Sequence, residues 1–144
     1  MEGKTKKIAR AFLVLGFIGG VDAGYLTYLH YGEASPFCSV FNHCDLVLTS
    51  PYAVFLGVPV ALIGLVYYLA IAGLSAAALG KDKGSFLKIA GIIAALGFLV
   101  SVWFVAVQVF VLHSLCLYCL FSAALSTALF IGALILAKRP RPTV

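Results

Sequence analysis

Hydrophobic residues gather along this chain in four long blocks that short polar segments separate. The blocks cover about residues 11–29, 52–79, 86–112 and 116–137. An α-helix needs roughly 20 predominantly apolar residues to cross the hydrocarbon core of a bilayer, and each block meets that length. The pattern therefore predicts an all-α integral membrane protein, a four-transmembrane-helix bundle that forms a single domain over residues 1–144.

The segments between the blocks predict the connections of the bundle. Residues 30–50 form the one substantial polar stretch away from the chain ends, and we expect an outer loop there. Gly57 and Pro59, near the start of the second block, predict a bend whose freed backbone groups are satisfied by neighbouring residues. A tight polar turn begins at Gly80, and a very short connection follows His113.

Composition and charge agree with a membrane protein and give its orientation. The chain is 63% hydrophobic and only 10% charged, whereas an average soluble domain has about 25% charged residues. The ten Lys and Arg residues form three groups: Lys4, Lys6, Lys7 and Arg10; Lys81, Lys83 and Lys88; Lys138, Arg139 and Arg141. Four crossings place all three groups on one side, which the positive-inside rule makes cytoplasmic, with both chain ends. Short basic flanks without stacking aromatics also argue against nucleic acid as a partner.

The first block carries two features that hydropathy alone does not explain. Gly16, Gly20 and Gly24 recur at every fourth residue and make a small-residue stripe on which a neighbouring helix can pack closely. Asp22 lies inside the block, where a carboxylate is costly, and it is a candidate functional residue for that reason. The alternative for Asp22 is a position near the interface, neutralised by protonation or by a hydrogen bond.

All four cysteines fall on the side opposite the basic groups, where disulfides form and persist. Cys38 and Cys44 lie in the outer loop, and Cys116 and Cys119 form a Cys-x-x-Cys pair at the start of the fourth block. Two thiols at this spacing fit one helical turn and can close a small disulfide ring. A helix N-terminus at Cys116 would favour its thiolate, the nucleophile of thiol–disulfide exchange.

Three functions are compatible with this cysteine set. In an electron relay, the loop pair meets a thiol partner outside the membrane, and the inner pair passes two electrons to a quinone in the bilayer. In a membrane scaffold, both pairs are structural disulfides, although Cys-x-x-Cys closes too few residues to be a strong constraint. In a metal-binding membrane protein, the ligands come from a mixed set: His43, Cys44, His113, Cys116 and Cys119.

The motifs also resemble those of a known family. They are Cys38-x5-Cys44, Ser50 six residues later, Gly57-Val-Pro-Val-Ala-Leu-Ile-Gly64, Cys116-Leu-Tyr-Cys119, and Tyr25-Leu-Thr-Tyr28. Over about residues 10–137 the chain resembles the vitamin K epoxide reductase family, in its prokaryotic branch of quinone-coupled, disulfide-forming enzymes. This resemblance implies a membrane oxidoreductase that reoxidises a thioredoxin-fold, DsbA-like partner and reduces ubiquinone or menaquinone, with no metal cofactor.

The resemblance also implies a role for individual residues. Cys38 and Cys44 would act as the electron-relay pair, with Cys44 attacking the inner pair at Cys116 and Cys119 facing the quinone. Ser50 would support the active site through a hydrogen bond. The expected quinone-binding residues are Val47, Leu48, Tyr52, Ile63 and Tyr67.

Two departures from the best-known members limit the activity that the resemblance implies. Val60 stands where an asparagine is expected, and Ala123 stands where vertebrate members carry a tyrosine. Both departures favour plain quinone reduction over epoxide reduction. The sequence ends at Val144 without a fused thioredoxin-like domain, so we expect a separate partner protein. We expect the chain in the plasma membrane, with its cysteines on the extracytoplasmic side.

Overall fold

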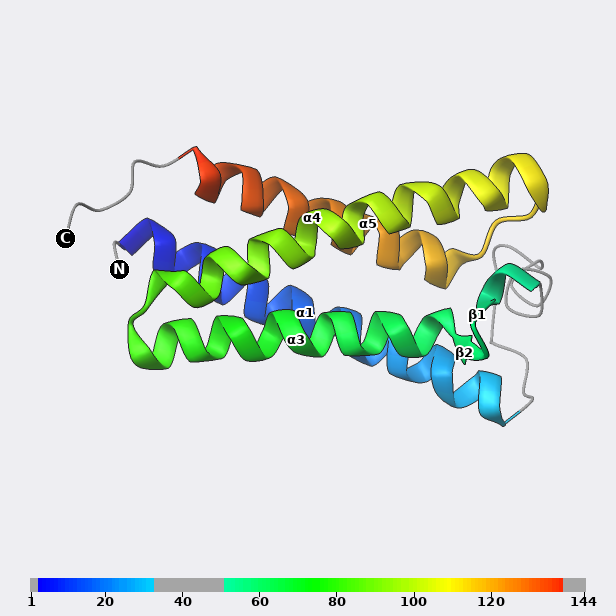
Figure 1. The fold of residues 1–144 in the computed structure, drawn as a ribbon, viewed down its shortest axis with the longest axis horizontal. Coiled ribbons are helices and arrows are strands. Elements are labelled where there is room, and N and C mark those ends of the chain that lie inside the picture. Colours follow the sequence, from blue (N-terminus) through cyan, green and yellow to red (C-terminus); the bar gives the residue numbers. More distant parts are fainter. Residues whose placement is uncertain (1–2, 33–50, 139–144) are drawn as a thin grey trace.

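Four long helices dominate the computed structural model, which describes residues 3–32 and 51–138. They are α1 (Gly3–Tyr31), α3 (Val60–Lys81), α4 (Gly84–Ala106) and α5 (Leu117–Ala137). Each is long and apolar enough to cross a membrane, α4 together with the helical turn that continues it. The four-helix bundle expected from the hydrophobic blocks is therefore confirmed (Figure 1).

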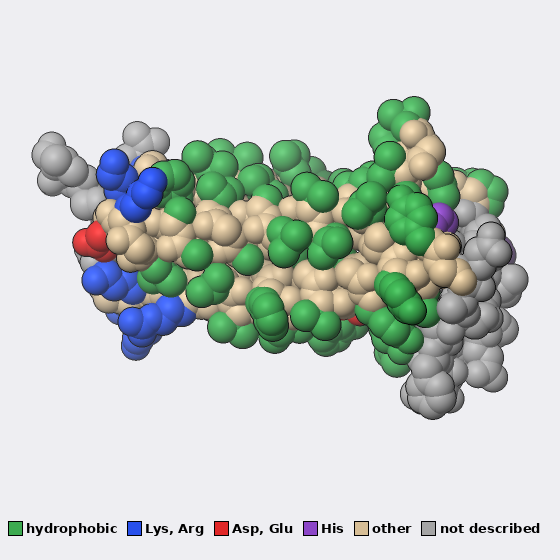
Figure 2. Space-filling model, turned by 90° about the horizontal axis from the view of Figure 1, so that it is seen from below, with side chains coloured by type: hydrophobic (Ala, Val, Ile, Leu, Met, Phe, Trp, Pro, Cys, Tyr) green, Lys and Arg blue, Asp and Glu red, His purple; other side chains and the backbone are tan. Residues whose placement is uncertain are grey.

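The four helices enclose a common interior. α1 packs mainly against α3 and α5, and α4 packs mainly against the same two helices from the other side. The beginning of α1, the end of α5 and the turn between α3 and α4 lie at one end of the bundle (Figure 1). Figure 2 shows Lys and Arg side chains at that end, and hydrophobic side chains along the middle of the visible face. The start of α5 lies at the opposite end, away from these charges.

The predicted small-residue stripe on α1 is confirmed as a close-packing surface against α3. A Cβ atom on Gly16 would lie 3.0 Å from the backbone oxygen of Tyr68 and 3.1 Å from the Cβ atom of Ala72. Gly20 and Gly24 also face α3, with more room. The absence of side chains on this face lets the two backbones approach closely.

The second hydrophobic block does not form a helix from its beginning. A 3₁₀ turn (Pro51–Ala53) leads into strands β1 (Val54–Phe55) and β2 (Val58–Pro59), and α3 begins only at Val60. The expected helix start near residue 52 was therefore wrong, and the predicted bend is an antiparallel hairpin. Gly57 reverses the chain with φ +82°, a conformation that glycine adopts without steric cost.

A π-helix (Val107–Val111) continues α4, and a short turn leads from it to α5. The Leu112 N–H donates to the Val107 carbonyl oxygen over 2.9 Å, which is the wide hydrogen bond of a π-turn. His113, with φ 51°, reverses the direction of the chain. Such π-turns inside α-helices occur frequently at functional sites.

Candidate active site

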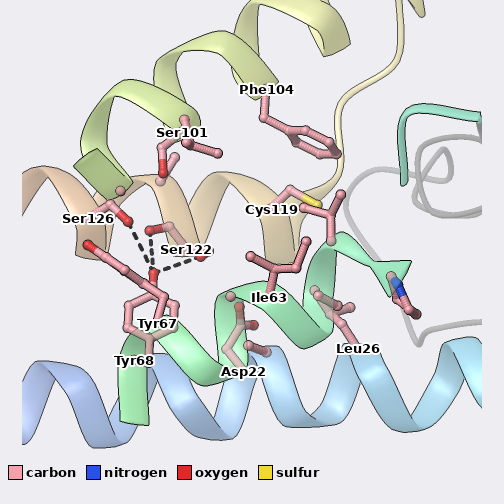
Figure 3. Close-up of a pocket in the computed structure, with 18 of the residues that line it drawn as sticks. Asp22, Leu26, Ile63, Tyr67, Tyr68, Ser101, Phe104, Cys119, Ser122 and Ser126 are labelled. Carbon is pink, nitrogen blue, oxygen red and sulfur yellow. Dashed lines mark hydrogen bonds between the residues drawn. The ribbon is translucent and has the colours of Figure 1, made fainter. Parts of the chain in front are cut away.

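A cavity of about 300 Å³ lies within the bundle, and all four helices contribute to its walls. Most of its surface is apolar, with a few polar side chains pointing inward (Figure 3). The lining residues that matter below are Asp22 and Leu26 from α1; Val60, Ile63, Tyr67 and Tyr68 from α3; Ser101, Phe104 and Gln108 from α4 and its π-helix; and Cys119, Ser122, Ala123 and Ser126 from α5. An apolar cavity with a small number of polar groups is typical of a site for a small ligand.

The cysteine pair lies where α5 begins. Cys116 is the N-cap residue of α5, with extended backbone angles, and it is fully buried. Cys119 follows in the first turn, is half-buried, and lines the cavity. The N-terminal N–H groups of a helix and its dipole stabilise negative charge at this position, which suits a thiolate. The arrangement can therefore carry out thiol–disulfide exchange beside an apolar cavity.

The surroundings of Cys116 hold it in place. Phe104, Leu112 and Tyr118 pack around it together with Cys119. The backbone N–H of Cys116 donates a hydrogen bond of 3.0 Å to the side-chain oxygen Oε1 of Gln108. Gln108 is itself fully buried, so this hydrogen bond ties the beginning of α5 to the π-helix inside the protein.

Hydroxyl groups at the far end of the cavity hold α3 against α5. The Tyr68 hydroxyl donates to the Ser122 backbone oxygen over 2.9 Å, and it shares hydrogen bonds with the hydroxyls of Ser122 (2.7 Å) and Ser126 (3.3 Å). Figure 3 shows this hydrogen-bonded group at one end of the cavity, with Cys119 and Phe104 at the other. Tyr67 and Tyr68 are adjacent in sequence, and their ring centroids lie 4.8 Å apart.

Three side chains that line the cavity carry buried polar atoms without a hydrogen-bond partner among the described residues. They are Oδ2 of Asp22, the hydroxyl oxygen of Tyr67 and Nε2 of Gln108. Buried polar groups in proteins nearly always have a partner, so each exception calls for an explanation. A bound molecule with its own polar atoms would supply these missing partners.

The structure brings together only some of the site residues expected from the sequence. Ile63 and Tyr67 line the same cavity as Cys119. Tyr52 is not among the lining residues, and its ring instead meets the ring of Trp103, with centroids 6.3 Å apart. The remaining expected site residues lie outside the described residues: Cys38, Cys44, Val47, Leu48 and Ser50.

The two positions that depart from the best-known pattern also belong to this cavity. Val60 and Ala123 both line it, and neither side chain can form a hydrogen bond. A group of three metal-ligating side chains is not found within residues 3–32 and 51–138. His43 and Cys44, two members of the metal site considered above, lie outside those ranges.

Tyr68, Ser101, Ser122 and Ser126 line the cavity without having been predicted, and so does Gln108. One signal for Gln108 exists in the sequence: Ser101 and Gln108 are polar residues in an apolar block, seven positions apart. That spacing is two helical turns and places both residues on one face. Both line the cavity, as that spacing would have indicated.

Comparison with known proteins identifies the family. The sequence model described as "Vitamin K epoxide reductase family" matches residues 10–134. Thiol-disulfide oxidoreductase LTO1 of Arabidopsis thaliana is 37% identical over 119 residues, which cover 76% of this chain and 31% of that protein. This chain thus spans about a third of the length of that relative. With a match over most of its length and four helices suited to a bilayer, this multi-pass membrane protein belongs to the vitamin K epoxide reductase family.

Proposed function

We propose that this protein is a membrane thiol-disulfide oxidoreductase that reoxidises a separate thioredoxin-fold, DsbA-like protein and passes the electrons to ubiquinone or menaquinone. Disulfide formation outside the cytoplasm would be its role. The observation that carries the proposal is the position of Cys119, which belongs to a Cys-x-x-Cys pair and opens on an apolar cavity inside the bundle. The name of the Arabidopsis relative supports the thiol-disulfide chemistry.

The proposed inner step balances without any further reactant. The thiols of Cys116 and Cys119 lose their two hydrogens and form one disulfide bond. The two electrons and two protons reduce the quinone to the quinol. In this step the start of α5 stabilises the attacking thiolate, and the apolar walls hold the ring and exclude water.

The proposed outer step restores the thiols of the inner pair. Cys38 and Cys44 would receive electrons from the partner protein, and the Cys44 thiolate would attack the Cys116–Cys119 disulfide at Cys116. A mixed disulfide forms and is resolved by the second thiol of the outer pair, as in other thiol–disulfide exchanges. The outer pair is thereby oxidised again, and Cys119 is ready for the next quinone.

A thiol count under anaerobic conditions tests the proposal directly. A variant with Cys38 and Cys44 replaced by Ala is reduced, freed of reductant, and mixed with ubiquinone or menaquinone. We expect both remaining thiols to disappear as one quinone per chain is reduced. If the thiols persist with both quinones while the protein stays folded, quinone is not the electron acceptor of this pair.

A further inference from the structure

The side-chain oxygen of Gln108 accepts the hydrogen bond from Cys116, and its NH₂ group takes no part in that contact. Resting on the proposed function, we propose that Gln108 binds a carbonyl oxygen of the quinone through Nε2, while Oε1 of the same amide caps Cys116. One amide group would then join the electron acceptor to the backbone of the redox pair. This hydrogen bond would orient the ring next to Cys119, which the cysteines themselves do not do.

The orientation of the amide is fixed by its known hydrogen bond. The backbone N–H of Cys116 is a donor, so the atom that receives it at 3.0 Å is the amide oxygen. The NH₂ group must then point away from Cys116. Its nitrogen is buried and has no acceptor among the described residues, and Gln108 is one of the residues that line the cavity.

The backbone around Gln108 holds this arrangement rigidly. The Gln108 carbonyl oxygen accepts a hydrogen bond of 3.0 Å from the Ser114 N–H, on the far side of the reversing turn. The side chain accepts a second one from Cys116, two residues further on. A fully buried side chain restrained at both its backbone and its oxygen has little freedom to turn Nε2 toward another partner.

The chemistry of the Gln108 NH₂ group favours a carbonyl oxygen as its partner. An NH₂ group donates only, so its partner must be an acceptor atom. The adjoining walls, which include Phe104 and Val105, suit a flat apolar ring rather than a charged molecule. Negative charge grows on a quinone oxygen as electrons arrive, and a fixed donor stabilises that charge. Val60 and Ala123 line the same cavity and offer no such donor.

The test compares two ligands that have the same carbon skeleton, one with carbonyl groups and one without. Menadione (2-methyl-1,4-naphthoquinone) carries two carbonyls, and 2-methylnaphthalene has the same two rings and none. Dissociation constants are measured by equilibrium dialysis of the purified protein in micelles, against protein-free micelles. The variant Gln108→Met keeps the length and flexibility of the side chain and removes the amide. The matched control is Ser75→Ala, since Ser75 is also fully buried, and its hydroxyl has no partner within residues 3–32 and 51–138, but it does not line the cavity.

We expect Gln108→Met to weaken menadione binding about tenfold, and to leave 2-methylnaphthalene binding within about twofold of the wild-type value. Ser75→Ala should change neither constant. Equal menadione affinity in the wild type and in Gln108→Met would overturn the inference and leave the proposed function intact. An equal loss of affinity for both ligands would also overturn the inference, because the amide would then only maintain the shape of the cavity.

Two further outcomes are distinguishable from these. A wild-type protein that does not bind menadione would contradict the proposed function itself, and the inference with it. If Gln108→Met cannot be purified, Gln108→Leu repeats the comparison, and unchanged 2-methylnaphthalene binding shows that the cavity has kept its shape.

Discussion

The polar groups at the two ends of the cavity differ in their hydrogen bonding. At the end formed by Tyr68, Ser122 and Ser126, the hydroxyls satisfy one another and hold α3 to α5. At the cysteine end, Gln108 has one partnered atom and one without a partner among the described residues. Closed networks of this kind stabilise a fold, whereas a buried polar group without a partner costs stability and is available to a ligand. The first end therefore serves the fold, and the second end serves the proposed chemistry.

The largest effect should come from the cysteine end. Cys119→Ala removes the sulfur that lines the cavity, and we expect quinone reduction driven by dithiothreitol to fall by at least about a thousandfold. Quinone consumption under anaerobic conditions measures it. The control is the variant with Cys38 and Cys44 both replaced by Ala, which should keep this activity because the small dithiol reaches the inner pair directly. Equal loss in the two variants would contradict the proposed order of the relay.

The next largest effect is expected at Gly19, which packs against the ring of Tyr68. The ring of Tyr68 occupies the space that a side chain on Gly19 would fill, so Gly19→Ala must displace a fully buried aromatic ring. We expect it to lower the free energy of unfolding by about 1–3 kcal/mol. Gly20→Ala is the matched control, since the nearest side-chain atom to its new Cβ would be 3.8 Å away. Thermal unfolding in detergent compares them, and similar losses for both would contradict this packing.

Tyr67 and Tyr68 test whether the hydrogen-bonded hydroxyls at the first end stabilise the fold. Tyr68→Phe deletes a hydroxyl with three hydrogen-bond contacts, and we expect a loss of about 1–2 kcal/mol in the free energy of unfolding. Tyr67→Phe deletes a hydroxyl without a partner among the described residues, and its stability should stay within about 0.5 kcal/mol of the wild type. A larger loss for Tyr67→Phe than for Tyr68→Phe would contradict the stabilising role given to the Tyr68 hydroxyl.

The smallest effect is expected at the basic end of the bundle. Nζ of Lys6 lies 3.9 Å from a carboxylate oxygen of Asp82, and both side chains are exposed. Pairs of this kind contribute little because water and salt screen them. Lys6→Ala should leave the unfolding temperature unchanged at low and high salt. A decrease that disappears on adding salt would show that this pair matters more than its exposure suggests.

Hydropathy predicted the helices well because a membrane span is defined by its length and its apolar side chains. The same criterion placed the start of the second span too early. Val54, Phe55 and Val58 are as apolar as helix residues, and only Gly57 and Pro59 mark the hairpin that they form. The predicted bend at these two residues was correct, but hydropathy does not distinguish a short apolar hairpin from the first turns of a helix.

The candidate site was predicted in part for a similar reason. Cys116 and Cys119 stand together in the sequence, and their place at a helix start follows from the boundary of an apolar block. Ile63 and Tyr67 were expected from the family resemblance, and they do line the cavity. The link from Gln108 to Cys116 depends on a π-turn and a reversal at His113. Neither has a recognisable signature in the sequence, so the role of this glutamine required the structure.

The hairpin before α3 has a consequence for how the protein sits in the bilayer. Its tip carries Phe55 and Leu56, which are 62% and 88% exposed, at the cysteine end of the bundle. Apolar side chains in such a position prefer the lipid interface to water, so we expect the tip to act as an anchor. Spin-label depth measurements at residue 56 would detect it. The immersion depth of Cys116 and Cys119 would then be set by a loop outside the helix that carries them.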